Sequence, residues 1–274
     1  VDTVYSIPIL LNKQKVDDTI LKKLNLKIKK PNLNDWKRVV KAKLLPEKEV
    51  NVSFVGKYTE LKDSYKSINE ALEHAGIQNK AKVNINFVEA EQSTSKNVRR
   101  VLKKSHAILV PGGFGERGIE GMILACKYAR ENNVPYLGIC LGMQIAIIEY
   151  ARNVLKLKSA NSTEFDSSTK FPVIGLITEW SDISGKKEKR TKNSDLGGTM
   201  RLGGQVCKLK KKSNSYKMYK KSEIIERHRH RYEVNPNYKD KMIEQGLDVV
   251  GTSIDGKLVA VSYTHLRAHE TRTH

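Results

Sequence analysis

The chain has 274 residues, of which 39% are hydrophobic and 29% charged, a balance typical of a soluble globular protein with one large domain. No apolar run approaches the roughly 20 residues that cross a bilayer, and residues 1–11 lack the basic start and cleavage site of a signal peptide, so we expect a cytoplasmic protein without a membrane partner. The net charge of +20 could attract nucleic acid, but the basic runs lack interleaved aromatic residues and no nucleic-acid-binding motif occurs, so we favour a lysine-rich solvated surface without a nucleic-acid partner.

Residues 1–47 predict short helices and no strand that alternates with them. Residues 17–26 fit one or two amphipathic turns, and the sequence PNLNDW at residues 31–36 supplies a break followed by a helix start. We interpret this segment as a connector from an upstream part of the protein.

Strands and helices alternate from residue 48 onward. The expected strands are 50–56, 82–88, 107–110 and 135–139, and the expected helices are 63–75, 97–104, 119–131 and 141–151. Short loops between them predict right-handed crossovers and a mostly parallel sheet with helices on both faces, a flavodoxin-like α/β domain over residues 48–261. Further strands are expected at 173–180, 198–209, 224–234, 249–254 and 257–261, and a charged surface loop at 181–195.

The strongest chemical signal is the sequence GICLG at residues 138–142, between a buried strand and a helix. It fits the sharp turn that exposes a nucleophile, here Cys140, with glycines where side chains would collide. The helix dipole there favours a thiolate, and the N–H of Leu141 would face the oxyanion of a substrate under attack. Cys126 and Cys207 have no such setting, so we assign them to packing, and the spacing of the three cysteines predicts neither a disulfide nor a metal site.

A second glycine-rich sequence, PGGFG at residues 111–115, follows the expected strand at 107–110. Glycines let backbone N–H groups approach a ligand closely, and ligand sites form at the carboxyl ends of parallel strands. This loop and the Cys140 turn should therefore face one pocket, where Gly113 would supply the second oxyanion donor. A phosphate-binding loop is rejected because no Gly-Lys-Ser/Thr ending follows.

These two segments, the second extended to YLGICLGMQ at residues 136–144, resemble the class I (triad) glutamine amidotransferases. Within that class, NSTEF at 161–165, SDLGGTMRLG at 194–203 and ERHRHRYEVN at 226–235 resemble the CTP synthases in particular. So does VYSIP at residues 4–8, which in that family closes the synthetase domain. The resemblance therefore implies that residues 1–47 are the end of a synthetase domain and the linker that follows it. The likeness covers residues 1–262, and another amidotransferase such as a GMP synthase is not expected to contain the segments at 194–203 and 227–235.

The resemblance implies a glutamine site built from both loops and from later parts of the chain. Glu164 would hold the α-amino group of glutamine and Arg231 its α-carboxylate, while the remaining site residues are Gly113, Leu141, Gly142, Met143 and Gln144. The implied reaction is glutamine hydrolysis through a γ-glutamyl thioester on Cys140. Its ammonia would pass to UTP that ATP has phosphorylated, giving CTP.

The resemblance implies no cofactor for this domain. ATP with Mg, and UTP, would bind the synthetase domain, which is missing from this chain. GTP would activate allosterically through a lid at residues 115–118, and the full-length protein is expected to be a homotetramer.

The base and acid of the catalytic triad are the part of the family pattern that we do not find. The family supplies them as His-Pro-Glu on a late strand, where side chains at i and i+2 face the same side, but this chain has no His-x-Glu or His-x-Asp. Residues 262–274 bear no likeness to the family, and we interpret them as a cloning or adapter artefact. The partner His and Glu are therefore expected to be absent, and the chain alone is expected to have little glutaminase activity.

A function of another class stays open at this point. The basic chain could be a non-catalytic binding module or a filament-assembly subunit. Labelling of Cys140 by a glutamine analogue would favour the enzyme, whereas salt-sensitive RNA binding without labelling would favour the module.

Overall fold

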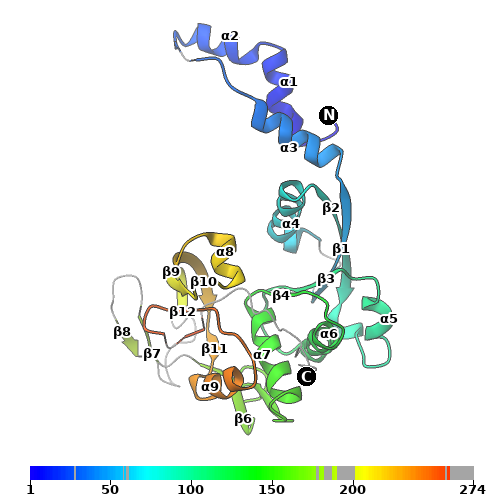
Figure 1. Ribbon diagram of the computed structural model, residues 1–274, viewed down its shortest axis with the longest axis vertical. Helices are drawn as coiled ribbons and strands as arrows, with labels where there is room; N and C mark the ends of the chain where they lie inside the picture. Colours follow the sequence, from blue (N-terminus) through cyan, green and yellow to red (C-terminus); the bar gives the residue numbers. More distant parts are fainter. Residues whose placement is uncertain are drawn as a thin grey trace, which may run out of the picture. The chain divides into compact units, whose positions relative to one another are not determined.

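The computed structural model describes residues 1–27, 29–57, 59, 62–176, 179–181, 187–189, 201–256 and 258–259, drawn in Figure 1. The chain forms two compact units, of which the first contains residues 1–52 and 61–85 and the second the rest. The boundary crosses two neighbouring strands, β1 (Lys48–Gly56) and β2 (Ala81–Glu89). Among the helices of the described ranges, none has the length and apolar character needed to cross a membrane.

The first unit is mainly helical, as the sequence of residues 1–47 predicts. Tyr5 Oη lies 2.9 Å from His74 Nε2, and Lys43 Nζ lies 2.8 Å from Glu73 Oε1, so one helix contacts two segments that are far apart in the sequence. That helix is α4, and the helices of the unit are η1 (Val4–Ser6), α1 (Ile7–Lys13), α2 (Val16–Lys23), α3 (Asn34–Leu44), η2 (Lys62–Tyr65) and α4 (Lys66–Gln78).

A sheet with the strand order β2-β1-β3-β4 is central to the fold. Its strands β3 (Ala107–Val110) and β4 (Tyr136–Gly138) are parallel, and Val110 lies opposite Gly138. The helices that alternate with these strands are α5 (Val98–Leu102), α6 (Ile119–Glu131) and α7 (Leu141–Asn153), with the short η3 (Ala90–Gln92) before them. The expected α/β architecture with a parallel central sheet flanked by helices is confirmed.

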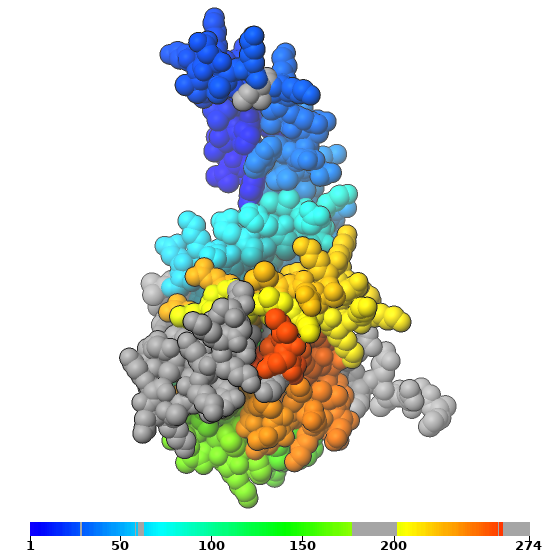
Figure 2. Space-filling model, turned by 90° about the vertical axis from the view of Figure 1, so that its left-hand side faces the viewer, coloured from blue at the N-terminus to red at the C-terminus, as the bar shows by residue number. Residues whose placement is uncertain are grey.

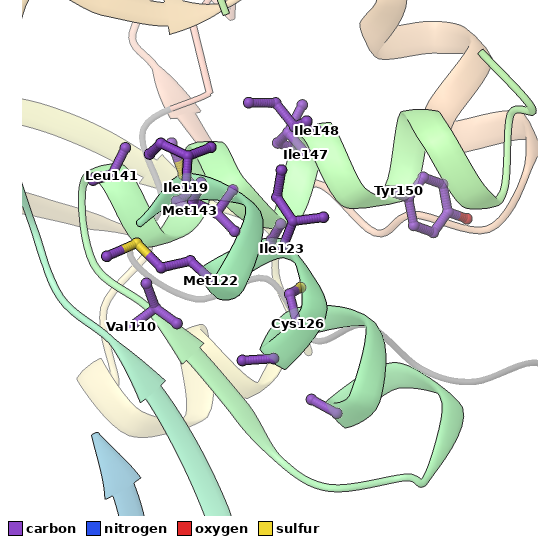
Figure 3. Packing of buried hydrophobic residues seen from close by; sticks show 14 of the residues in the cluster. Val110, Ile119, Met122, Ile123, Cys126, Leu141, Met143, Ile147, Ile148 and Tyr150 are labelled. Carbon is purple, nitrogen blue, oxygen red and sulfur yellow. The ribbon is translucent and has the colours of Figure 1, made fainter. Parts of the chain in front are cut away.

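The core of the second unit lies where α6 and α7 pack on each other and on β3. Figure 3 shows Met122 of α6 and Leu141 of α7 near Val110, at the end of the strand. All three side chains are buried, as is every residue of α7 from Leu141 to Ala151. Burial of such side chains stabilises the fold by about 1.5–3 kcal/mol each. The N-terminus of α7, which carries Cys140, is therefore held on a rigid layer.

The C-terminal half adds smaller sheets to this layer. One has the order β11-β6-β5, from β5 (Ala160–Ser162), β6 (Phe171–Leu176) and β11 (Tyr232–Val234). Another is antiparallel with the order β10-β9-β12, from β9 (Arg201–Leu209), β10 (Glu223–His230) and β12 (Gly251–Ser253). The remaining elements are the pair β7 (Glu179–Ser181) and β8 (Lys187–Lys189), and the helices α8 (Asn214–Tyr219) and α9 (Pro236–Glu244).

Helix α9 packs beside the segment that carries α7. The orange and green segments are adjacent in both views (Figures 1 and 2), and Tyr150 Oη donates a hydrogen bond to Gln245 O at 2.6 Å. This contact ties the C-terminal half of the chain to the helix that follows Cys140.

Several expected elements differ from the structure. The strand expected at 173–180 corresponds to two strands in different sheets, β6 (Phe171–Leu176) and β7 (Glu179–Ser181). The single strand expected at 224–234 is divided at Arg231, because β10 pairs with β9 whereas β11 pairs with β6. Part of the loop expected at 181–195 is strand β8, which pairs antiparallel with β7. Of the strand expected at 257–261, the structure describes residues 258 and 259, where Val259 bridges to Thr252.

Candidate active site

Cys140 occupies a strained turn between β4 and α7. Its backbone has φ 54° and ψ −106°, a conformation that residues with a side chain rarely adopt. A Cβ at Gly138 would lie 2.4 Å from the carbonyl oxygen of Gly142, and a Cβ at Gly142 would lie 2.1 Å from Val110 O. The two glycines are therefore required by close backbone contacts, as the sequence predicts, and the turn places Cys140 at the N-terminus of the helix.

The glycine-rich loop after β3 lies against the cysteine. A Cβ built on Gly112 would be 3.8 Å from Cys140 Sγ, and one built on Gly113 would be 3.2 Å from a methyl group of Leu141. Cys140 is half-buried, whereas Cys126 and Cys207 are buried. The expected meeting of the two loops is observed, and it leaves Cys140 as the accessible thiol of the three.

Lys57 forms hydrogen bonds to backbone carbonyl groups of the glycine-rich loop. Its ammonium group donates hydrogen bonds to Phe114 O at 2.8 Å and to Gly115 O, and its side chain is buried. Burial lowers the pKa of Lys57, and the carboxylate of Glu164 acts in the opposite direction. Sequence reasoning missed this residue, although its place directly after strand β1 is where functional residues of parallel sheets gather.

Glu164 forms a hydrogen bond with the same loop. Its Oε1 accepts a hydrogen bond from Gly115 N at 2.8 Å, which brings the segment after β5 to the loop after β3. Burial raises the pKa of Tyr232, Glu164 raises it further, and Arg231 lowers it. Glu164 and Arg231 are thus both close enough to Tyr232 to influence its hydroxyl group, so the structure gathers the predicted anion and cation in one region.

The side chain of Arg231 has a hydrogen-bond donor for which the described residues provide no acceptor. Its Nε is buried and has no hydrogen-bond acceptor within the described ranges. Gln144 Nε2 donates to Tyr232 O at 2.9 Å, which ties the first turn of α7 to the residue after Arg231. Met143 and Gln144 are themselves buried, so they support the turn.

His230 and Glu233 form a pair that sequence reasoning did not find. His230 Nδ1 lies 3.0 Å from Glu233 Oε1, and the two side chains are 12% and 3% exposed. Burial would lower the pKa of His230, but its interactions with the side chains of Cys140 and Glu233 raise it to about 10. The family pattern places the His and the acid two positions apart on a strand, whereas these two residues are three positions apart across the division at Arg231.

A third ionisable group lies beside this pair. The rings of His228 and His230 are 5.1 Å apart, and His228 Nε2 lies 3.5 Å from Cys207 Sγ. Ligand atoms of His228, His230 and Glu233 fall within 4.8 Å of one another. The cysteine assigned to packing, Cys207, is therefore a neighbour of the histidines while being fully buried.

The remaining predicted features stay predictions. Residues 194–200 and the tail at 262–274 lie outside the described residues. Gly115 and Gly118, in the expected lid, have positive φ values of 75° and 71°, which glycine adopts without strain. The domain boundaries at residues 47 and 261 also remain predictions.

Comparisons with known proteins agree with this geometry. The sequence model of the family described as glutamine amidotransferase class-I matches residues 60–269. Among solved structures, the chain is similar to the glutaminase domain of Trypanosoma brucei CTPS with bound acivicin, with 35% sequence identity, a TM-score of 0.67 and 78% of each chain covered. The cysteine turn, the loop it contacts and the Glu164–Arg231 region all fall in the matched range, and this chain belongs to the class I glutamine amidotransferase family, in which it is similar to the glutaminase domain of CTP synthase.

Proposed function

We propose that this chain is the glutaminase part of a CTP synthase, whose reaction is the hydrolysis of glutamine through a thioester on Cys140. The observation that carries the proposal is the position of Cys140, half-buried on a strained turn against the loop of Gly112. A thiol that is held there, at a helix N-terminus and beside a glycine-rich backbone, has the setting of an acyl-transfer nucleophile.

The backbone around Cys140 supplies the donors that the reaction needs. Leu141 is the first residue of α7, and the first N–H groups of a helix have no partner inside it. Gly113 lies against the side chain of Leu141, so its backbone borders the same space. We propose that these two N–H groups stabilise the oxyanion that forms when Cys140 attacks the γ-amide.

The substrate's α-amino and α-carboxylate groups would be bound by charges of opposite sign. Glu164 provides the anion and Arg231, with its unused buried Nε, provides the cation. Charge-assisted hydrogen bonds of this kind are about twice as strong as neutral ones, so the pair would select an amino acid over a simple amide. The bound glutamine analogue in the T. brucei structure supports this choice of substrate.

The fate of the ammonia follows from the family likeness. A synthetase domain, whose end we place at residues 1–47, would use ATP and Mg to phosphorylate UTP, and ammonia would then replace the phosphorylated oxygen to give CTP. GTP would act as the activator. Glutamine-dependent formation of CTP by the chain joined to such a domain, and its loss when glutamine is replaced by an unreactive analogue, would test this part.

A covalent glutamine analogue tests the nucleophile directly. We expect 6-diazo-5-oxo-norleucine to add once to the chain, at Cys140, and millimolar glutamine to slow the addition. Cys140→Ser should remove the adduct, whereas Cys126→Ser, at a fully buried thiol, should keep it. Intact-mass and peptide mass spectrometry provide the readout. Labelling at Cys126 or Cys207, or an adduct that glutamine does not slow, would contradict the proposal.

Substitution of Arg231 tests the substrate contact. Arg231→Met removes the proposed partner of the α-carboxylate, and the loss of a hydrogen bond to a charged group costs about 1.5–3 kcal/mol. We expect the glutamine concentration that half-protects Cys140 from labelling to rise by about 10- to 100-fold. Arg229→Met, at an exposed position of β10, is the matched control and should leave protection unchanged. Equal protection constants for the two variants would rule out the assigned role.

A further inference from the structure

The loop that follows β3 passes the cysteine turn with little side-chain packing of its own. Gly112 and Gly113 lie against that turn, but the next two residues are exposed. The ring of Phe114 is 50% exposed, and a Cβ built on Gly115 would meet no atom of the described residues within 4 Å. Packing therefore does not fix this part of the loop, and hydrogen bonds to its backbone have to do so.

The peptide group between Phe114 and Gly115 is bound on both sides by charged side chains. Its carbonyl oxygen, Phe114 O, accepts a hydrogen bond from Lys57 Nζ at 2.8 Å, and its N–H donates to Glu164 Oε1 at 2.8 Å. The bond is trans, so the C=O and N–H groups point to opposite sides. Hydrogen bonds to charged groups are stronger than neutral ones, so a cation and an anion together fix the plane of this peptide.

The cation in this arrangement is itself held in place. Lys57 is the lysine that the fold buries among the described residues, and it directly follows β1, the neighbour of β3 in the sheet. Its ammonium group also donates to Gly115 O, while its own carbonyl oxygen accepts a hydrogen bond from Arg117 Nη2 at 2.7 Å. Arg117 Nε lies 3.0 Å from Glu91 Oε1. Hydrogen bonds in both directions therefore join the end of β1 to the loop after β3.

We propose that Lys57 is a positioning residue for glutamine hydrolysis, whose ammonium group, opposite Glu164, holds the loop so that the N–H of Gly113 faces the oxyanion. The inference rests on the proposed glutaminase function and adds a residue to it. Gly113 directly precedes the peptide that Lys57 and Glu164 bind, so release of that peptide frees the donor to turn away. Lys57 acts through the loop, and its hydrogen bonds go to the loop rather than to the sulfur.

Glu164 links the position of the loop to the binding of the substrate. Its Oε1 accepts the hydrogen bond from Gly115 N, which leaves Oε2 for the α-amino group of glutamine in the proposed site. Burial lowers the pKa of Lys57 and the charge of Glu164 raises it, so the two groups also interact directly through their charges. Because one carboxylate serves both purposes, the effects of substitutions at Lys57 and Glu164 should not be additive.

Two ligands that protect Cys140 from iodoacetamide separate the position of the loop from simple binding. Glutamine reports the ground state. The γ-aldehyde analogue of glutamine adds the thiol to its carbonyl group: the S–C bond forms, the C=O π bond opens, and the thiol proton passes to oxygen. The oxygen of the resulting hemithioacetal lies where the oxyanion of the reaction would lie, so the affinity of the aldehyde reports the oxyanion donors.

Lys57→Met should weaken the aldehyde selectively. We expect its half-protecting concentration to rise by about 10- to 100-fold, because a displaced donor no longer meets the oxygen of the adduct. The half-protecting concentration of glutamine should change by less than about threefold, since Lys57 does not bind the α-amino or α-carboxylate group in the proposed site. Arg231→Met, by contrast, should raise both concentrations.

Four further variants separate charge, hydrogen bonding and stability. Lys57→Arg keeps the cation and should recover most of the aldehyde affinity, whereas Lys57→Gln, a neutral donor, should be intermediate and replaces Lys57→Met if that variant does not fold. Lys82→Met, at a lysine of β2 whose side chain is 58% exposed, is the matched control. Leu102→Ala, at a buried position of α5, should lower the Tm and leave both protection constants unchanged.

Hydrogen exchange measures the position of the loop without any ligand. In the intact chain the amide of Gly115 is protected by its hydrogen bond to Glu164. We expect the peptide that covers residues 111–117 to exchange at least about tenfold faster in Lys57→Met, and at the original rate in Lys82→Met. Mass spectrometry of peptic fragments provides the readout.

The two proposals fail in different ways. If a folded Lys57→Met retains the aldehyde affinity of the intact chain, the assignment of Lys57 is wrong and the glutaminase function stands. If Leu102→Ala weakens the aldehyde as much as Lys57→Met does, a general loss of stability explains the effect and the assignment is again overturned. If neither ligand protects Cys140 in the intact chain, the glutaminase function fails, whatever the exchange rates of the loop.

Discussion

Gly142→Ala is expected to displace the first turn of α7 and, with it, Cys140. The new Cβ would lie 2.1 Å from Val110 O and 2.9 Å from Val110 C, closer than side chains approach a backbone. Val110 ends a buried strand of the central sheet, so the helix has to move rather than the carbonyl. Overpacking of this kind costs about 1–3 kcal/mol or more, which corresponds to a fall in Tm of roughly 5 °C.

Gly142→Ala should affect the rate at which Cys140 is labelled more strongly than it affects the free energy of unfolding. A shift of about 1 Å at a reacting centre can cost 100-fold in rate, so labelling by the glutamine analogue should slow by about that factor. Gly175→Ala is the control, because among the residues that the structure describes a Cβ there would meet Thr163 Oγ1 alone, at 4.0 Å. Thermal melts and mass spectrometry of both variants provide the test. A Gly142→Ala chain with unchanged Tm and labelling would show that the turn does not depend on this glycine.

The cysteine turn could be predicted because its constraint is local. A nucleophile at φ 54° needs small residues two positions away on either side, and the sequence GICLG at residues 138–142 has a glycine at both of these positions. The continuous apolar run at 107–110 behaves likewise, because the strand expected there has those bounds in the structure. Burial on all sides requires such runs, so their limits are visible without knowledge of the partners.

The His230–Glu233 pair could not be predicted, because it depends on pairing between distant segments. The stretch 224–234 resembles one strand, and only the competition between β9 and β6 as partners divides it. Lys57 was missed for a similar reason. Lysine is rarely buried without partners, and its partners here are two loop carbonyls nearly 60 residues away, which no local pattern reveals.

Arg130→Met is expected to destabilise the second unit by about 3–5 kcal/mol, the cost of leaving a buried charge without its partner. Glu149 on α7 is fully buried, and Arg130 on α6 donates to both of its carboxylate oxygens at 2.8–3.1 Å. Burial raises the pKa of the neighbouring Cys126, and the charge of Glu149 raises it further. Denaturant unfolding of the variant measures the loss.

A double substitution separates the ion pair from simple packing. Arg130→Met with Glu149→Leu replaces the buried pair by apolar side chains, which is often neutral or stabilising, so most of the lost free energy should return. Lys210→Ala breaks an exposed pair with Asp248, at 2.6 Å with side chains 60% and 52% exposed, and should cost under about 1 kcal/mol. If Arg130→Met lowered the free energy of unfolding by no more than Lys210→Ala does, the Arg130–Glu149 ion pair would not be what fixes α7 on α6. Because α7 begins at the residue after Cys140, the same loss should appear as slower labelling in Arg130→Met and recover in the double variant.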